Sequence, residues 1–250
     1  MRMFHSLIVV VSLVGATGCG EQHAQRPPRR IVVAGASSLT EVLDDVIELF
    51  ERAHPGVKVS ASFGASSSLI AQIQQGAPID VVAVADDAAL DPLRTIAAVN
   101  SAVAVATNRM AIIVPKGNPA RITALGDLAD PKVKVALCTE KVPCGSLARS
   151  VLSAAGLAVT PVTSEENAKA VVAKVRLGEV DAGVVYLTDG LAAADRTEMV
   201  PIPDGVNATA TVAAAVVTRT DQPVASESFR AFLVSPTARR AFAARGFGPA

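Results

Sequence analysis

The sequence contains no tryptophan and one tyrosine among its 250 residues, and aromatic residues make up only 3% of it. Sites for sugars, peptides and single-stranded nucleic acids depend on aromatic faces for stacking. An excess of positive charge is also lacking, because 23 basic residues balance 23 acidic residues. Nucleic acids and acidic membrane surfaces select partners with a basic excess. The composition therefore argues against nucleic acid and is consistent with a small, polar ligand.

Histidine is scarce, which limits the enzymatic chemistry open to the chain. A catalytic serine or cysteine needs a base, usually a histidine. His5 and His23 precede the predicted folded part, and we expect His54 to be exposed in a turn. Ser66 and Ser67 lie in no Gly-x-Ser-x-Gly elbow. A serine hydrolase therefore stays only as the alternative from a different class, and we expect no enzyme.

Residues 1–18 are predicted to be a signal peptide. Arg2 supplies a short positive end, and residues 4–14 are largely apolar. This run is too short to span a bilayer comfortably and lies where the apolar part of an export signal is found. The mature protein is therefore expected outside the cytoplasm.

Cys19 is predicted to carry a lipid that anchors the protein to the cell membrane. Small residues lead into it as in a lipobox, although Ala16 stands where leucine is usual. Ordinary secretion, with cleavage near Gly18, is the alternative. Residues 19–30 are polar, contain proline and lack apolar periodicity, so they are interpreted as the lipidated N-terminus and tether.

From residue 31 onward, apolar residues alternate between the periods of strands and helices. Residues 39–52, for example, place their apolar side chains on one helical face. The predicted strands are 30–34, 57–61, 79–85, 110–114, 133–137, 182–186 and 208–217. The predicted helices are 39–52, 68–75, 146–155, 168–177, 225–234 and 236–245. This order predicts an α/β fold with parallel strands.

The elements form two series, which predicts two lobes joined by two chain crossings. Residues 31–107 together with 208–250 are predicted to form lobe 1, and residues 108–207 to form lobe 2. Such an arrangement is a clamp that closes on a ligand held between the lobes.

Hydroxyl groups and free backbone amides gather where predicted strands end and helices begin. These junctions are residues 34–40, 62–69, 138–145 and 163–168. Ligands of open parallel sheets bind at this place, against helix N-termini. Unpaired N–H groups and the helix dipole bind anions there without lysine or arginine. Each Ser or Thr alone is more often a helix cap, so the prediction of an anion site depends on their joint placement.

Four segments resemble the molybdate-binding proteins of ABC importers in their order and spacing. They are Ala36-Ser-Ser-Leu-Thr40, Ser62-Phe-Gly-Ala-Ser-Ser67, residues 72–81 and Gly183-Val-Val-Tyr-Leu-Thr-Asp189. The similarity runs from about Ile31 to Phe247. It implies a two-lobed type II binding-protein fold, each lobe a mixed, mostly parallel sheet flanked by helices, with the ligand in the cleft. Together with the lipidation predicted at Cys19, it implies an extracytoplasmic substrate-binding lipoprotein that delivers molybdate or tungstate to a permease and its ATPase.

The resemblance also assigns donors to the anion, position by position. They are the Ser38, Ser66 and Tyr186 hydroxyls and the Cys144 and Ala168 amides, with Ser37 and Asn167 as further candidates. Ser37 stands where the family often has alanine, so either Ser37 or Ser38 is the donor. The oxyanion is expected to be held through its oxygens, with no direct protein–metal ligand, no cofactor and no counter-ion. The protein is expected to act as a monomer.

Two other ligands are weighed against molybdate. Sulfate, or another tetrahedral oxyanion, suits the same lobes and is the runner-up. A donor-only lining disfavours protonated phosphate, which needs an acceptor. A ferric-iron site of this fold usually needs several tyrosines and a histidine, whereas Tyr186 is the sole tyrosine.

Cys138 and Cys144 remain when Cys19 is taken by lipidation. The space outside the membrane is oxidising. The two cysteines are six residues apart with Pro143 between them, so their Cα atoms can approach the roughly 4.4–6.8 Å that a disulfide requires. We hypothesise a Cys138–Cys144 disulfide that holds the Cys144 amide in place. Two buried free thiols are the alternative.

Overall fold

The computed structural model describes residues 28–250. The predicted signal peptide, the lipidation site at Cys19 and most of the predicted tether lie outside the described residues. Within the part of the chain that is described, no helix combines the length and the apolar character needed to cross a membrane.

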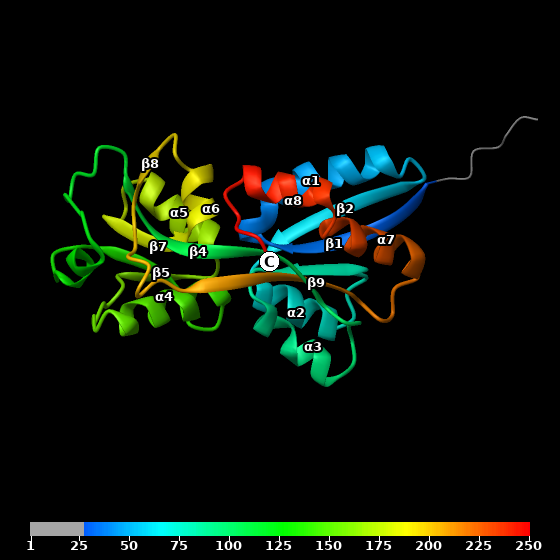
Figure 1. Ribbon diagram of the computed structural model, residues 1–250. Helices are drawn as coiled ribbons and strands as arrows, with labels where there is room; N and C mark the ends of the chain where they lie inside the picture. The colour runs from blue at the N-terminus through cyan, green and yellow to red at the C-terminus, as the bar shows by residue number, and fades with distance from the viewer. Residues whose placement is uncertain (1–27) are drawn as a thin grey trace, which may run out of the picture.

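A mixed sheet of nine strands runs through the whole molecule (Figure 1). The strands are β1 (Arg29–Ala36), β2 (Val57–Gly64), β3 (Val81–Val84), β4 (Val103–Pro115), β5 (Val135–Cys138), β6 (Thr163–Glu165), β7 (Ala182–Tyr186), β8 (Thr197–Val200) and β9 (Thr209–Val216). Their order is β2-β1-β3-β9-β4-β7-β5-β6, with β8 also paired to β4. β1 is parallel to β2 and β3, and β5 is parallel to β6 and β7. The antiparallel pairs all involve β4 or β9.

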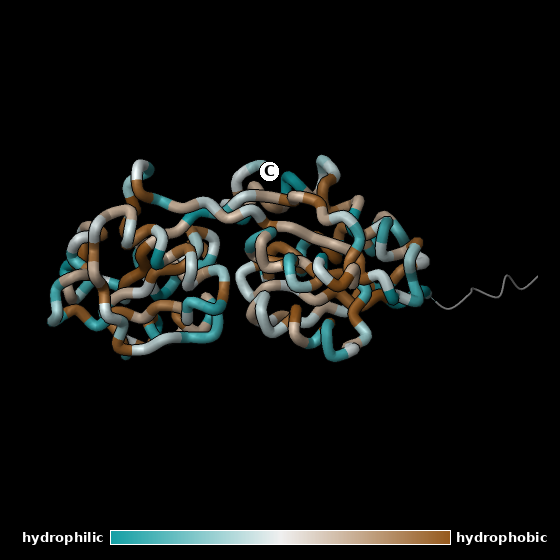
Figure 2. The backbone as a smooth tube through the Cα atoms, turned by 90° about the horizontal axis from the view of Figure 1, so that it is seen from below, coloured by the Kyte–Doolittle hydropathy of each residue, from teal (hydrophilic) through white to brown (hydrophobic). Residues whose placement is uncertain are grey.

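Strands β4 and β9 run between two lobes, which Figures 1 and 2 show as separate bodies. The first part of β4, up to Arg109, pairs with β9. From Met110 onward, β4 pairs with β7 and β8. The first lobe contains β1, β2 and β3, and the second contains β5, β6, β7 and β8. The predicted two-lobed α/β fold is thereby confirmed, while the predicted boundaries at 107/108 and 207/208 stay a prediction.

Helices cover both faces of the sheet in each lobe. Around the first lobe lie α1 (Thr40–Ala53), α2 (Ser66–Gln74), α3 (Asp91–Thr95), α7 (Pro223–Leu233) and α8 (Pro236–Ala244). Around the second lie α4 (Pro143–Ala154), α5 (Ala168–Arg176) and α6 (Leu187–Ala192). Short 3-10 helices are η1 (Ser37–Leu39), η2 (Asp87–Leu90) and η3 (Leu125–Ala129). Because helices cover both faces, β3 and β7 are buried along their whole length.

Helix α1 shows how apolar spacing builds the core of the first lobe. Its residues Val42, Leu43, Val46 and Phe50 are buried on one face. The Phe50 ring meets the edge of Phe229 of α7, with ring centroids 5.1 Å apart. These contacts fix α1, and with it the 3-10 turn η1 before it, against the sheet.

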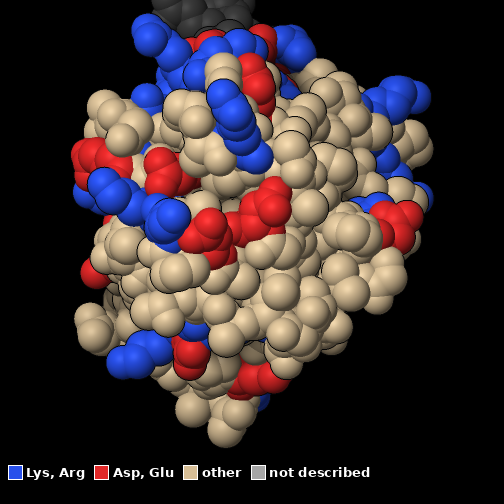
Figure 3. Space-filling view, turned by 90° about the vertical axis from the view of Figure 1, so that its left-hand side faces the viewer, with Lys and Arg blue, Asp and Glu red and all other residues tan. Residues whose placement is uncertain are grey.

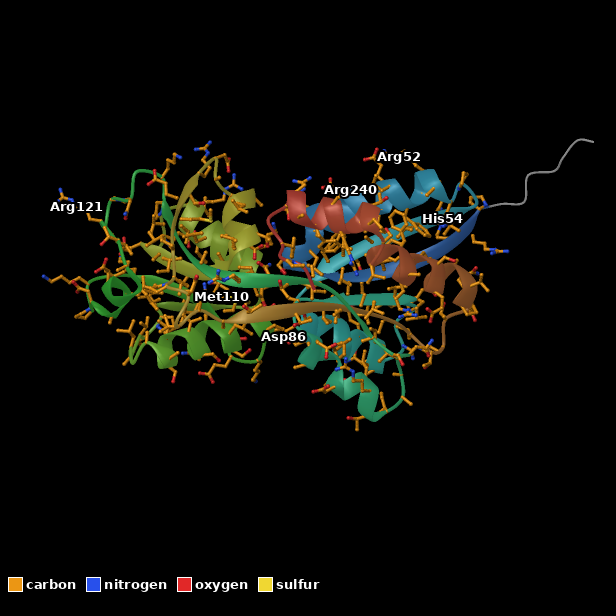
Figure 4. All side chains as sticks on the ribbon, viewed as in Figure 1. Arg52, His54, Asp86, Met110, Arg121 and Arg240 are labelled. Atoms are coloured by element: carbon orange, nitrogen blue, oxygen red, sulfur yellow. A yellow bond between two sulfur atoms is a disulfide. The ribbon has the colours of Figure 1, made fainter. Side chains whose placement is uncertain are left out.

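His54, the residue after α1, is half-buried, and the prediction of an exposed turn was wrong. Its ring stacks on Phe50 with centroids 4.2 Å apart, and its Nδ1 lies 3.0 Å from the Phe50 carbonyl oxygen. Figure 4 shows it at the end of the first lobe away from the second lobe. His54 therefore does not supply a base for Ser66 or Ser67.

Candidate anion-binding site

The residues proposed as donors lie together around one cavity between the lobes. The cavity is lined by Ala36, Ser37, Ser38, Gly64, Ala65, Ser66, Ala85, Val142, Pro143, Cys144, Glu166, Asn167, Ala168 and Tyr186. This set includes all five predicted donors and both further candidates. The first lobe presents Ser38 and Ser66, and the second presents the other three. Their role as ligands stays a prediction, but the fold does bring them together from widely separated parts of the chain.

The cavity is small. Its volume is about 20 Å³. A single water needs about 10–15 Å³, so the cavity suits one compact ligand. Sugars, peptides and nucleotides are too large for it in this arrangement of the lobes.

The two serine hydroxyls are held by the starts of helices. Ser66 is the first residue of α2, and its side-chain oxygen accepts a hydrogen bond from the Ala85 N–H at 3.3 Å. Because that oxygen already accepts from the protein, the Ser66 hydrogen is free to point into the cavity. Ser38, in η1, is also buried. Ser67, the second residue of α2, is exposed and does not line the cavity.

The Tyr186 hydroxyl is buried at the end of β7 and has no hydrogen-bond partner within residues 28–250. An unpaired buried hydroxyl costs about 1–3 kcal/mol, so the unpaired Tyr186 hydroxyl indicates a functional role. Burial, with smaller contributions from the carboxylates of Asp189 and Asp86, raises the pKa of Tyr186 well above its usual value. The phenol therefore keeps its proton and remains a donor at every physiological pH.

Backbone donors come from the first turns of α4 and α5. In α4 the N–H groups of Gly145 and Ser146 donate to the Val142 carbonyl, whereas Cys144 lies in the first turn and has no intrahelical acceptor. In α5, Asn167 caps the helix by accepting from the Ala170 N–H at 3.0 Å. Ala168 precedes Ala170, and its N–H likewise lacks an intrahelical acceptor. The helix dipoles add positive potential at both amides.

The hypothesised disulfide is present in the structure. Cys138 and Cys144 are bonded, with their Cα atoms 5.9 Å apart. The bond joins the last residue of β5 to the first turn of α4. The loop between them packs directly on the helix, since a Cβ on Gly145 would lie 1.8 Å from the Thr139 carbonyl oxygen. Disulfide and glycine together fix the position of the Cys144 amide.

The charges near the cavity differ in part from the expectation. Of the described residues, no Lys, Arg or His lines it. Glu166, however, is an acidic residue among those that line the cavity, and it is exposed. Asp86 also lies on the side of the first lobe that faces the second (Figure 4). Acidic and basic side chains are intermixed on the face of the second lobe in Figure 3, with no basic field.

Behind the cavity lies a buried carboxylate that the sequence analysis missed. The Asp189 side chain is 0% exposed, and neither of its oxygens has a hydrogen-bond partner in the described part of the chain. Burial raises the pKa of Asp189 from 3.8 to about 7, although the nearby Lys169 ammonium opposes this rise. The one signal in the sequence was its place at the end of the segment 183–189. Among residues 28–250, no cluster of His, Cys, Asp and Glu is suited to hold a metal ion.

Comparison with known proteins gives the following matches. The family described as bacterial extracellular solute-binding protein matches residues 31–248. The molybdate-binding protein ModA of Mycobacterium tuberculosis is 34% identical over 249 residues, which cover 96% of this chain and 95% of that protein.

Two solved structures share the fold. The periplasmic molybdate-binding protein of Azotobacter vinelandii has a TM-score of 0.77 at 20% identity, covering 87% of this chain and 98% of that one. The sulfate-binding protein SubI of Mycobacterium tuberculosis also has a TM-score of 0.77, at 19% identity, covering 88% of this chain and 87% of that one. The backbone fold alone therefore does not distinguish between these two anions.

Proposed function

The chain belongs to the bacterial extracellular solute-binding proteins, and from this premise we propose that it binds molybdate, and tungstate, for an ABC importer. The observation that carries the proposal is the convergence of neutral donors from both lobes on one small cavity. The 34% identity to a molybdate-binding protein over nearly the whole chain supports this choice of ligand.

The proposed donors match the chemistry of the ligand. A molybdate dianion carries no proton at neutral pH, so its oxygens only accept hydrogen bonds. The hydroxyls of Ser38, Ser66 and Tyr186 and the amides of Cys144 and Ala168 can all donate. Each hydrogen bond to a charged acceptor contributes about 1.5–3 kcal/mol, from which desolvation and ordering costs are subtracted. Five such bonds support tight binding without a counter-ion.

The position between the lobes accounts for capture and release. Donors from both lobes reach the anion together only when the lobes meet, so binding and closure are coupled. We propose that the closed protein docks on a permease, whose ATPase drives release and import. In this scheme the protein acts as a monomer outside the cytoplasm, is not an enzyme and needs no cofactor.

Anchoring at Cys19 is a separate part of the proposal. A lipid on Cys19 would keep the binding protein beside its permease. Mass spectrometry of the protein extracted from membranes would detect the lipid. A Cys19→Ala variant is expected to leave the membrane fraction, and its retention there would contradict the anchor.

Sulfate is the second candidate, because a sulfate-binding protein shares the fold equally well. Calorimetric titration of the purified protein with molybdate, tungstate and sulfate in one buffer decides between them. We expect molybdate and tungstate to bind at least about a hundredfold tighter than sulfate, a difference of about 2.7 kcal/mol. Equal or tighter binding of sulfate would make sulfate the proposed ligand instead of molybdate. If none of the three anions gave a binding signal, the proposed anion site would be rejected.

A further inference from the structure

Lys169 bridges the two lobes beside the candidate site. Its Nζ lies 2.5 Å from Oε1 of Glu41 and 3.8 Å from Oδ1 of Asp189. Glu41 is on α1 in the first lobe, whereas Lys169 and Asp189 are on α5 and α6 in the second. Within residues 28–250, Lys169–Glu41 is the one side-chain ion pair that joins the lobes.

All three charged residues lie in the first turns of helices next to the cavity. Glu41 is the second residue of α1, and α1 begins directly after the 3-10 turn that holds Ser38. Lys169 follows Ala168 in α5. Asp189 is in the first turn of α6, which begins directly after Tyr186. The ammonium thus connects the three segments that present these donors to the cavity, although Lys169 itself does not line it.

The two carboxylates differ in their burial and in the lobe to which they belong. Asp189 is fully buried and has no hydrogen-bond partner among the described residues. A buried carboxylate of this kind is costly without a nearby positive charge, and Asp189 lies on the same lobe as Lys169, so their contact does not depend on how the lobes are arranged. Glu41 is 39% exposed and belongs to the other lobe. Opening of the cleft must therefore break the contact with Glu41 and leave the contact with Asp189.

We propose that Lys169 is a positioning residue that holds the lobes closed over the bound anion, through Glu41 and from its anchor on Asp189. The proposal rests on the proposed function. Lys169 does not touch the anion. It acts because the anion cannot leave until Lys169 and Glu41 separate. Its removal therefore raises the dissociation rate and leaves the association rate nearly unchanged.

The test measures both rate constants for molybdate by stopped flow, using the fluorescence of Tyr186, the sole tyrosine of the chain. A partly exposed pair contributes little, so Lys169→Met and Glu41→Gln should each raise the dissociation rate about two- to fivefold. Lys169→Arg should restore most of the wild-type rate. The double variant should be no faster than either single variant, because both remove the same contact.

Lys174→Met is the matched control. Lys174 lies on the same helix and pairs with Glu179 at 2.6 Å, but both residues belong to the second lobe. Its rates should equal those of the wild type. The proposal is overturned if Lys169→Met and Glu41→Gln dissociate no faster than this control, or if only their association slows. Glu41→Gln leaves Asp189 paired, so it decides the question if Lys169→Met fails to fold.

A second measurement separates this proposal from the proposed function. If the wild-type protein binds no molybdate, the function fails, but the contact between the lobes is still testable by small-angle X-ray scattering of the free protein. Glu41→Gln should then have a larger radius of gyration than wild type and Lys174→Met. Equal radii in all three proteins would overturn the proposal for Lys169 in that case.

Discussion

Replacing Tyr186 by phenylalanine removes one hydroxyl from the candidate site and leaves the ring in place. In the described part of the chain this hydroxyl has no hydrogen-bond partner, so the folded protein loses no internal hydrogen bond. A hydrogen bond to a charged acceptor contributes about 1.5–3 kcal/mol. Tyr186→Phe should therefore weaken molybdate binding by about 10- to 150-fold. The unfolding free energy of the free protein should stay unchanged or rise by about 1 kcal/mol, because a buried unpaired donor is removed.

Two measurements on the same variant test this reasoning. Calorimetry gives the affinity, and urea denaturation without ligand gives the unfolding free energy. Ser226→Ala is the control with the reverse pattern, since the Ser226 hydroxyl is buried away from the cavity and donates to the Gln222 carbonyl at 2.8 Å. It should cost about 1 kcal/mol of stability and leave the affinity unchanged. Affinity of Tyr186→Phe within twofold of wild type, or a stability loss like that of Ser226→Ala, would refute a donor role for Tyr186.

Three further predictions concern other residues around the site. Ser66→Ala should weaken molybdate binding by about 1.5–3 kcal/mol, while Ser67→Ala, which alters an exposed neighbour, should not; equal affinities in calorimetry would contradict the assignment of Ser66. Burial raises the pKa of Asp189 from 3.8 to about 7, so ionisation of Asp189 lowers the unfolding free energy. This loss grows between about pH 4 and pH 7 and is complete above pH 7. Asp189→Asn should therefore raise the unfolding free energy most above pH 7. If the unfolding free energy gained by this variant in urea denaturation does not grow with pH, ionisation of Asp189 is not its cause. Reduction of the Cys138–Cys144 disulfide removes roughly 2–3 kcal/mol of stabilisation at most but frees the Cys144 amide. The loss of molybdate binding free energy should therefore exceed the loss of unfolding free energy that the melting temperature of the free protein reports. Equal affinities with and without reductant would exclude a role of the disulfide in holding the amide.

The strands and helices that the sequence predicted correctly are those with a clear apolar period. Residues 182–186 and 168–177 are examples, found as β7 and α5. The first part of β4 was missed because Thr107, Asn108 and Arg109 interrupt its apolar pattern where the strand crosses between the lobes. β6 and β8 were missed because they are short, and β6 is wholly polar while β8 is half polar. Their strand conformation comes from pairing with β5 and β4.

The candidate site was predictable where it depends on local order along the chain. Each predicted donor follows a strand or opens a helix, and strand ends meet at one edge of a sheet. Lys169 and Glu41 were not predictable in this way, because their contact joins residues 128 positions apart. The burial of Asp189 likewise depends on how α6 packs, and α6 is too short to show an apolar period.

The position of β9 has a consequence for how the chain folds as it is made. In the first lobe β9 lies between β3 and β4, yet β3 ends at Val84 and β9 begins at Thr209. The second lobe is synthesised between them, so β3 keeps an unpaired edge until most of the chain has emerged. Pairing across such a long separation is slow. The first lobe therefore cannot complete its sheet until residues 209–216 have been synthesised, after the whole of the second lobe.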